Sequence, residues 1–374
     1  MSDPIKVYND IIKSNSGKVP CSNTGATEVK SEPFRAISID WLSVSCKIIR
    51  EPKQFFQIEH ASYGNSIWFT IRIFKVNNMP FFTVFSNPKS SILPNDSAIL
   101  KFENWILYSD QFKFNALQLI DDAGLSYTKI NRADIALDFH NFDHNLNPHT
   151  LIQMIVNEKI NRLGKGKFTL IGRSHKQLRY DYLRFGTKNS PVSVYLYNKS
   201  QEFREVAVKQ HIMRNWELIG YNPNKDVWRL EISIVGNVKQ LYDNASGELL
   251  YITIYTLLDS YYLRCIYYSL FLRYFSFKYV DKTKHYSNWK PVQLLSNSKD
   301  YALSVSDIEH VPNATRIHKI VIGKMIDFYD TAHFTSKQEK INYYNSIITY
   351  TTRYQLTNWA IQVKGLQHHS QIDL

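Results

Sequence analysis

The sequence predicts an α+β fold built on antiparallel sheet. Two successive blocks rich in strand patterns are each interrupted by a helical pattern, which is typical of antiparallel sheet with packed helices. After Leu249 the pattern changes to long helical segments. The chain of 374 residues is 44% hydrophobic and 21% charged, which excludes a disordered or fibrous protein. We therefore expect a sheet core of two strand-rich blocks with packed helices, followed by a helical C-terminal region.

The first block follows a polar N-terminus. Residues 1–33 are dominated by Ser, Asn, Thr, Lys and Glu without a sustained period, so they predict a disordered tail. Apolar and polar residues alternate over Ile37–Trp41, as in a strand with one buried face. Helical spacing over 112–123 ends at Gly124. Further strand patterns lie at 67–76, 81–85 and 99–107.

The second block repeats this order of strand and helix. Its first helix is predicted over 148–163, with Pro148 in the first turn and Gly164 beyond the last. A second helical pattern covers 201–217. Strand patterns lie at 131–139, 168–172, 180–185, 192–198 and 227–235.

The C-terminal part of the chain is predicted to be helical. Residues 249–280, 313–329 and 336–361 show helical patterns, and the last of these begins with a capping box, Ser336 to Glu339. We place a domain boundary after residue 280, which gives a core over 34–280 and a helical module over 281–374.

Several classes of protein are excluded by composition. The three cysteines fit neither a disulfide framework nor a zinc site. The most apolar stretch, 249–280, carries four charged residues and does not predict a membrane span. The N-terminus has no apolar segment of a signal peptide, so we expect a cytoplasmic protein.

Positive charge is concentrated in one window, residues 159–188. This window holds nine lysines and arginines against one acid, Asp181, and contributes +8 of the net charge of +12. Such a stripe predicts contacts with a phosphate backbone, although a solvated basic loop would look the same. The residues predicted to bind DNA are Lys165, Lys167, Arg173, Lys176 and Lys188.

Carboxylates lie on two strands that are otherwise apolar. On the strand 131–139, Asp134 and Asp138 share one face, because side chains alternate along a strand. On the strand 227–235, Arg229 and Glu231 share a face in the same way. Carboxylates held together favour a bound divalent cation with oxygen ligands. The alternative is a solvent-facing polar side of each strand.

A third strand, 192–198, ends in a run of tyrosines followed by a lysine. Tyr195, Tyr197 and Lys199 share a face there. A tyrosine hydroxyl is a competent nucleophile for phosphoryl transfer when a cation stabilises the phenolate, and Lys199 is one such cation. Tyrosines also favour strands for purely structural reasons.

Together these three strands resemble the replication initiation factor family of the Rep_trans type, the tyrosine nickases that start rolling-circle replication of plasmids and phages. The resemblance rests on the order and spacing of three motifs and covers roughly residues 36–280. The motifs are Arg-Ala-Asp-Ile-Ala-Leu-Asp-Phe (132–139), Tyr-Leu-Tyr-Asn-Lys-Ser-Gln-Glu (195–202) and Val-Trp-Arg-Leu-Glu-Ile-Ser-Ile (227–234).

The resemblance implies a site-specific DNA nickase over 34–280. Its nucleophile falls on Tyr197, which would form a 5′-phosphotyrosine and leave a free 3′-OH primer, then religate the strand. Lys199 and Arg229 are the implied catalytic cations. Mg²⁺ or Mn²⁺ would be held by the carboxylates Asp134, Asp138 and Glu231.

The resemblance also implies partners: plasmid or phage origin DNA, a host polymerase and a helicase. We expect residues 281–374 to recognise the origin or to form a homodimer, unless these helices only cover the sheet. Two other functions stay open, a conjugative relaxase of the same family and a non-catalytic nucleic-acid-binding protein.

Overall fold

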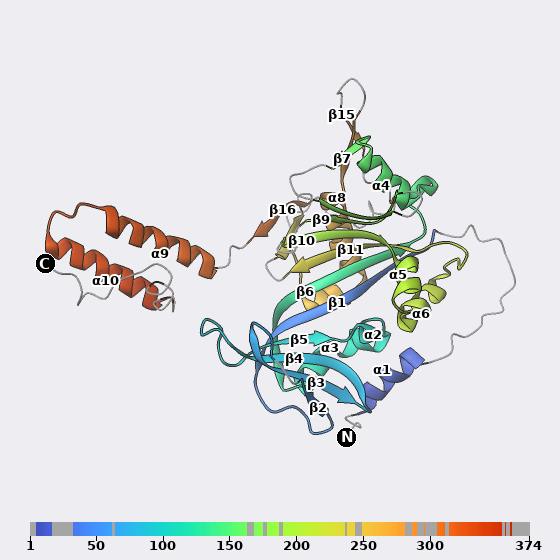
Figure 1. Ribbon diagram of the computed structural model, residues 1–374. Helices are drawn as coiled ribbons and strands as arrows, with labels where there is room; N and C mark the ends of the chain where they lie inside the picture. The colour runs from blue at the N-terminus through green and yellow to red at the C-terminus, as the bar shows by residue number, and fades with distance from the viewer. Residues whose placement is uncertain are drawn as a thin grey trace. The chain divides into compact units, whose positions relative to one another are not determined.

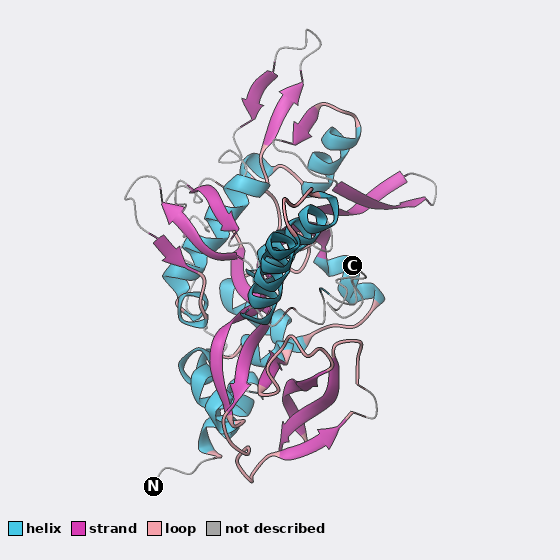
Figure 2. Ribbon diagram, turned by 90° about the vertical axis from the view of Figure 1, so that its left-hand side faces the viewer, coloured by secondary structure: helices cyan, strands magenta, loops and turns pink. Residues whose placement is uncertain are grey.

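A computed structural model defines the fold. It describes residues 5–16, 33–61, 64–162, 168–174, 178–186, 190–235, 238–243, 249–280, 286–289, 295, 305–310, 314–353, 356 and 360. Both helices and strands are present, as Figure 2 shows, and the strands of the largest sheet pair antiparallel, which confirms the α+β class. Within the described part of the chain, no helix is both long and apolar enough to cross a bilayer.

The core of the fold is a sheet of ten antiparallel strands in the order β2-β3-β4-β5-β1-β6-β11-β10-β9-β8 (Figure 1). The two predicted strand-rich blocks form its two halves, and they meet where β1 pairs with β6. In chain order the strands are β1 (Arg35–Ile48), β2 (Gln57–His60), β3 (Trp68–Val76), β4 (Met79–Pro88), β5 (Ser97–Phe102), β6 (Leu125–Phe139), β8 (Phe168–Ser174), β9 (Leu178–Phe185), β10 (Val192–Asn198) and β11 (Trp228–Val235).

One face of this sheet is apolar and belongs to the main core. Alternation places Ile135 and Leu137 of β6 on this face, and both are fully buried. Helix α8 (Ser260–Tyr274) packs against it, where the Tyr267 hydroxyl donates a hydrogen bond to the Leu230 carbonyl at 3.0 Å. Helices α3 (Asp110–Asp122) and α4 (Pro148–Val156) contribute to the same core.

The other face is polar and is covered at one end by short helices. These are α2 (Asn104–Leu107), α5 (Lys199–Glu205) and α6 (Gln210–Ile219). Trp216 and Ile212 of α6 pack with Phe203 of α5 and Ala36 of β1 in a small separate cluster. This end of the polar face therefore lies beneath a lid of three helices.

Two small sheets and one short helix accompany the large sheet. A three-stranded sheet joins β7 (Ile160–Arg162), β14 (Phe277–Val280) and β15 (Tyr286–Trp289). A second joins β12 (Val238–Asp243), β13 (Leu249–Tyr251) and β16 (Val305–His310). Helix α7 (Ile254–Leu258) precedes α8, and a single 3₁₀ turn, η1 (Asp143–Asn145), precedes α4.

Two predicted helices are shorter than the sequence indicated. The helix predicted over 148–163 ends at Val156, because Glu158 adopts a positive φ of 54° and the chain then enters β7. The helical pattern over 249–280 is divided at Asp259, whose carboxylate accepts hydrogen bonds from the backbone N–H groups of Tyr261 and Tyr262 and so starts a new helix.

The N-terminus differs from the prediction. Residues 6–16 form helix α1 (Lys6–Ser16) and not a disordered segment. Tyr8 and Ile11, three residues apart, share one helix face and are fully buried in the main core. The Tyr8 hydroxyl donates to Asp122 at 3.1 Å. Val7 and Ile12 of the same helix also pack against this core. The polar composition of residues 1–33 as a whole gave no sign of these few apolar positions. Residues 17–32 lie outside the described residues.

The chain divides into two compact units. The first comprises residues 1–89 and 95–309, and the second comprises residues 90–94 and 310–374. In the second unit, α9 (Ala314–Thr331) and α10 (Lys337–Arg353) pack through Ile322, Ile326 and Ile347. The helices predicted over 313–329 and 336–361 are thus present. The residues just before them form strands β14, β15 and β16 where described, so the change to helix comes later than residue 281.

Candidate active site

The polar face of the sheet carries a buried ion pair between Arg229 and Asp138. These residues are partners on the adjacent strands β11 and β6. Arg229 Nε donates to Asp138 Oδ1 at 2.6 Å and Nη2 donates to Oδ2 at 2.7 Å, and neither side chain is exposed. Trp216 Nε1 of α6 adds a third hydrogen bond to Asp138, at 2.7 Å. Both oxygens of the Asp138 carboxylate therefore accept hydrogen bonds from protein donors.

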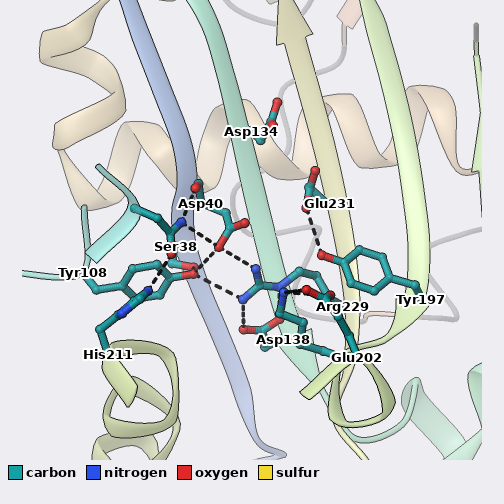
Figure 3. Close-up of polar contacts among 12 residues, drawn as sticks. Ser38, Asp40, Tyr108, Asp134, Asp138, Tyr197, Glu202, His211, Arg229 and Glu231 are labelled. Carbon is teal, nitrogen blue, oxygen red and sulfur yellow. Dashed lines mark hydrogen bonds and ion pairs between the residues drawn. The ribbon is translucent and has the colours of Figure 1, made fainter. Parts of the chain in front are cut away.

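Arg229 also reaches a second carboxylate, Asp40 of β1. Its Nη1 lies 2.6 Å from Asp40 Oδ1, and the Tyr108 hydroxyl donates to the same oxygen at 2.7 Å (Figure 3). Burial alone would raise the pKa of Asp40, but Arg229 and then Lys199 outweigh it and hold the pKa below its usual range. Asp40 is thus a second ionised carboxylate beside the Arg229 guanidinium.

Sequence reasoning missed Asp40. It is the residue at which the pairing of β1 with β6 shifts register, between Ile39 and Trp41. In a regular strand its side chain would follow simple alternation, and the bulge redirects it. The signal available in the sequence was a single Asp in a strand pattern, which is too common to single out. Tyr108, His211 and Trp216 come from helices or loops far along the chain and gave no signal either.

Tyr197 contacts Glu231 across neighbouring strands. The Tyr197 hydroxyl donates to Glu231 Oε2 at 3.2 Å, and Figure 3 shows the phenol of β10 pointing toward that carboxylate. Burial and then the Glu231 charge raise the pKa of Tyr197 well above its ordinary value. Burial, followed by the nearby Asp134 and Asp40, raises the pKa of Glu231 to about 7. The phenol therefore sits beside a carboxylate that accepts protons near neutral pH.

Lys199 is the first residue of helix α5 and lies beneath the phenol. Its ammonium is 5.5 Å from the Tyr197 ring centroid and 5.3 Å from that of Phe203. It is only 2% exposed and donates to both carboxylate oxygens of Glu202, at 3.0 and 2.9 Å. Burial and then the Arg229 charge lower its pKa. Lys199 therefore contributes positive charge to the phenol from within the protein.

Asp134 lies farther along β6, paired with Ser233 of β11 and Trp41 of β1. Arg132 binds it through two nitrogens, Nε to Oδ1 at 2.9 Å and Nη2 to Oδ2 at 2.6 Å. Burial raises the pKa of Asp134 despite this ion pair. Asp134 in turn helps to raise the pKa of Glu231, which lies on the neighbouring strand and the same face.

The three carboxylates predicted to hold a metal do not converge. Asp138 pairs with Arg229 and Trp216, whereas Asp134 and Glu231 lie toward Ser233 and Tyr197. In the parts of the chain that the structure describes, no three His, Cys, Asp or Glu side chains are grouped to hold a metal ion. Both Asp138 oxygens accept hydrogen bonds from Arg229 or Trp216, and both Asp134 oxygens accept hydrogen bonds from Arg132. Asp138 differs from Asp134 in its partner, because Arg229 is fully buried whereas Arg132 keeps 40% of its side chain exposed. The metal ligands stay a prediction.

The predicted DNA-binding stripe falls largely on residues whose placement is not described. Lys165, Lys167, Lys176 and Lys188 lie outside the described residues. Arg173 belongs to β8, at the edge of the large sheet, and its backbone position is all that is described. The stripe stays a prediction.

Comparison with known proteins adds one structural similarity. No family model and no curated protein match the chain. A solved structure, the "Rolling Circle Replication Initiator Protein from Geobacillus stearothermophilus", is similar with a TM-score of 0.41 and 14% sequence identity. The match covers 72% of this chain and 92% of that one. A similarity of this size does not identify the function.

Proposed function

We propose that the protein nicks one strand of an origin DNA through Tyr197 and initiates rolling-circle replication. The observation that carries the proposal is the hydrogen bond from the Tyr197 hydroxyl to Glu231, with Lys199 and Arg229 beside the same phenol. A nucleophile in contact with a base, with cations nearby, is the arrangement that covalent catalysis requires.

In the proposed step, the Tyr197 oxygen attacks the scissile phosphorus as its proton passes to Glu231. The bond from phosphorus to the 3′-oxygen breaks, and the 3′-oxygen takes up a proton to become a free hydroxyl. The products are a 5′-phosphotyrosine and a 3′-OH that a polymerase can extend. Reversal of the same step reseals the strand without ATP, because the ester conserves the bond.

The two cations have different roles in this proposal. Lys199 lies under the ring and stabilises the negative charge that develops on the phenolate. Arg229 is fully buried and bonded to Asp138, so it acts through position and charge and does not contact the phosphate. The positive charges of Lys199 and Arg229 favour ionisation of the Tyr197 hydroxyl, whereas burial of the phenol opposes ionisation.

Mg²⁺ or Mn²⁺ is part of the proposal, with Asp134 and Glu231 as the two carboxylates that would hold it. The negative charge of Asp134 raises the pKa of Glu231, and a cation bound beside them would relieve that effect. When bound, such an ion would polarise the scissile phosphate. One Glu231 oxygen accepts the Tyr197 hydrogen bond, which leaves the other for the ion.

The test is incubation with supercoiled plasmid that carries the parental origin, in Mg²⁺, followed by denaturing gel electrophoresis. The proposal predicts a nicked strand that migrates with protein attached. Specific binding without a nick would instead identify a non-catalytic DNA-binding protein. Nicking of a transfer origin in place of a replication origin would identify a relaxase. A cytoplasmic setting, a host polymerase and helicase, and a homodimer belong to the same proposal.

A further inference from the structure

A tryptophan on the polar face lies between two cations. Trp41 of β1 has the ammonium of Lys101, from β5, 4.2 Å from its ring centroid. The guanidinium carbon of Arg132, from the strand β6 on the other side of β1, is 5.1 Å from the same centroid. All three side chains are partly exposed. We call these three residues the tryptophan cluster.

The tryptophan cluster touches the candidate site. Trp41 is the β1 partner of Asp134, and Arg132 binds the Asp134 carboxylate. Arg132 keeps 40% of its side chain exposed. No carboxylate in the described part of the chain lies within ion-pair distance of Lys101. Its ammonium can therefore turn to an incoming phosphate when another flat group takes its place on the ring.

A second group of two aromatic rings and a cation lies beyond Asp134 and Glu231, on the strands β10 and β9. Tyr195 of β10 and Tyr182 of β9 have ring centroids 6.2 Å apart, and the guanidinium carbon of Arg184 is 5.3 Å from the Tyr195 centroid. Tyr195 is the strand partner of both Arg184 and Glu231. Paired residues share a face, so this group and the tryptophan cluster lie on the same polar face.

The strand order fixes how these groups are arranged. β1, β6, β11 and β10 are consecutive neighbours, so Asp134 and Glu231 lie on the two strands between Trp41 and Tyr195. Three strand spacings of about 4.8 Å place the outer two strands roughly 15 Å apart. Acidic groups in the centre with an aromatic and a cation on each flank form a line across the strands.

We propose that this line is a track for single-stranded DNA, in which one base stacks on Trp41 and another on Tyr195, on opposite sides of the phosphate at Tyr197. The inference rests on the proposed function and adds the form of its substrate. Unpaired bases expose both ring faces to such stacking, whereas paired bases in a duplex do not. Lys101, Arg132 and Arg184 supply the positive charge that phosphates need between stacked bases.

The test measures binding and not cleavage, so that it does not depend on the chemistry. We would measure fluorescence anisotropy of a mixed-sequence 20-nucleotide single strand and of the same sequence as duplex, with the Tyr197→Phe protein in EDTA. Trp41→Ala is expected to weaken single-strand binding about five- to 150-fold and to leave duplex binding nearly unchanged. Lys101→Gln should lower the salt slope for the single strand by about 0.7.

Two matched controls lie on α3, which packs on the opposite face. Phe114 is an aromatic with 82% exposure, and Lys113 is an exposed lysine. Phe114→Ala and Lys113→Gln are expected to bind both probes as the parent does. If Trp41→Ala binds the single strand like the Phe114→Ala control, or loses duplex binding equally, the track is wrong.

A second measurement uses the unaltered side chains, in case Trp41→Ala fails to fold. Single strands that carry 5-iodouracil at one position at a time are irradiated on the full-length protein, and cross-linked peptides are identified by mass spectrometry. The track predicts cross-links to Trp41 and Tyr195 from bases on opposite sides of one phosphate. Cross-links confined to other segments would overturn it. If the cross-links form but no covalent nick is ever seen, the track stands and the proposed function fails.

Discussion

Arg229 and Asp138 form a two-point ion pair on adjacent strands of the sheet, and neither side chain is exposed. Trp216 and Tyr108 bond to the same pair from two covering segments, so it ties the helical lid to the sheet. Because Arg229 is the strand partner of Tyr197, this ion pair also lies beside the phenol and contributes to the electrostatic potential there. The pair is therefore both a structural link and a positioning device.

Removing one partner should destabilise the fold strongly. Arg229→Met leaves Asp138 buried without its charge partner, which typically costs about 3–5 kcal/mol. The double variant Arg229→Met with Asp138→Asn should lose less than the sum of the two single changes. Urea unfolding followed by circular dichroism measures both. Equal stability of Arg229→Met and the parent would contradict the pairing.

Tyr197→Phe removes only the hydroxyl and its hydrogen bond to Glu231. Folding and DNA binding should persist while covalent adduct is lost by more than about a thousandfold, as for removal of a nucleophile. Tyr195→Phe is the matched control, two positions away on the same strand face, and should keep forming adduct. A reversed outcome would move the nucleophile to Tyr195.

The sequence predicted the sheet face better than the contacts on it. Alternation placed Asp134 and Asp138 on one face of their strand, and the register of β6, β11 and β10 puts Glu231 and Tyr197 on that same face of the sheet. Which carboxylate meets which cation depends on register and on α6, which supplies Trp216 from 78 residues beyond Asp138. Pattern alone could not distinguish a metal ligand from the partner of a buried arginine.

The pH dependence of stability follows from Glu231. Its pKa is raised from 4.5 to about 7 in the fold, so the folded state favours the protonated form. Stability should therefore fall as pH rises from about 4.5 through 7, and Glu231→Gln should remove this loss. In EDTA, thermal melts at pH 5 and pH 8 should show Glu231→Gln more stable than the parent at pH 8 only. The same difference at both pH values would argue against the shift.

Metal removal should abolish nicking and leave the fold intact. EDTA is expected to prevent adduct formation, with recovery on addition of Mg²⁺ or Mn²⁺. Asp134→Ala should raise the metal concentration needed for half-maximal nicking by about tenfold or more, because one of two carboxylates is lost. Full activity in EDTA would exclude a metal from the reaction.

Origin preference should depend on the second unit. Lys324 of α9 is 82% exposed, and α10 carries further basic residues. A chain that ends at Glu309, the last residue of the first unit, should nick a single-stranded origin oligonucleotide. It should lose the preference for origin duplex over random duplex. Retained preference would place recognition in the first unit and leave the helices α9 and α10 a covering role.

Covalent joining of Tyr197 to DNA can be measured by identifying the amino acid that carries the nucleotide. After reaction with origin plasmid and Mg²⁺, nuclease and protease digestion leaves a peptide with a nucleotide attached, which fragmentation by mass spectrometry can locate. We predict a phosphodiester between the Tyr197 oxygen and the 5′ end of the nucleotide. A nucleotide on Tyr195 or on any other residue, or a nick with no peptide attached, would contradict it.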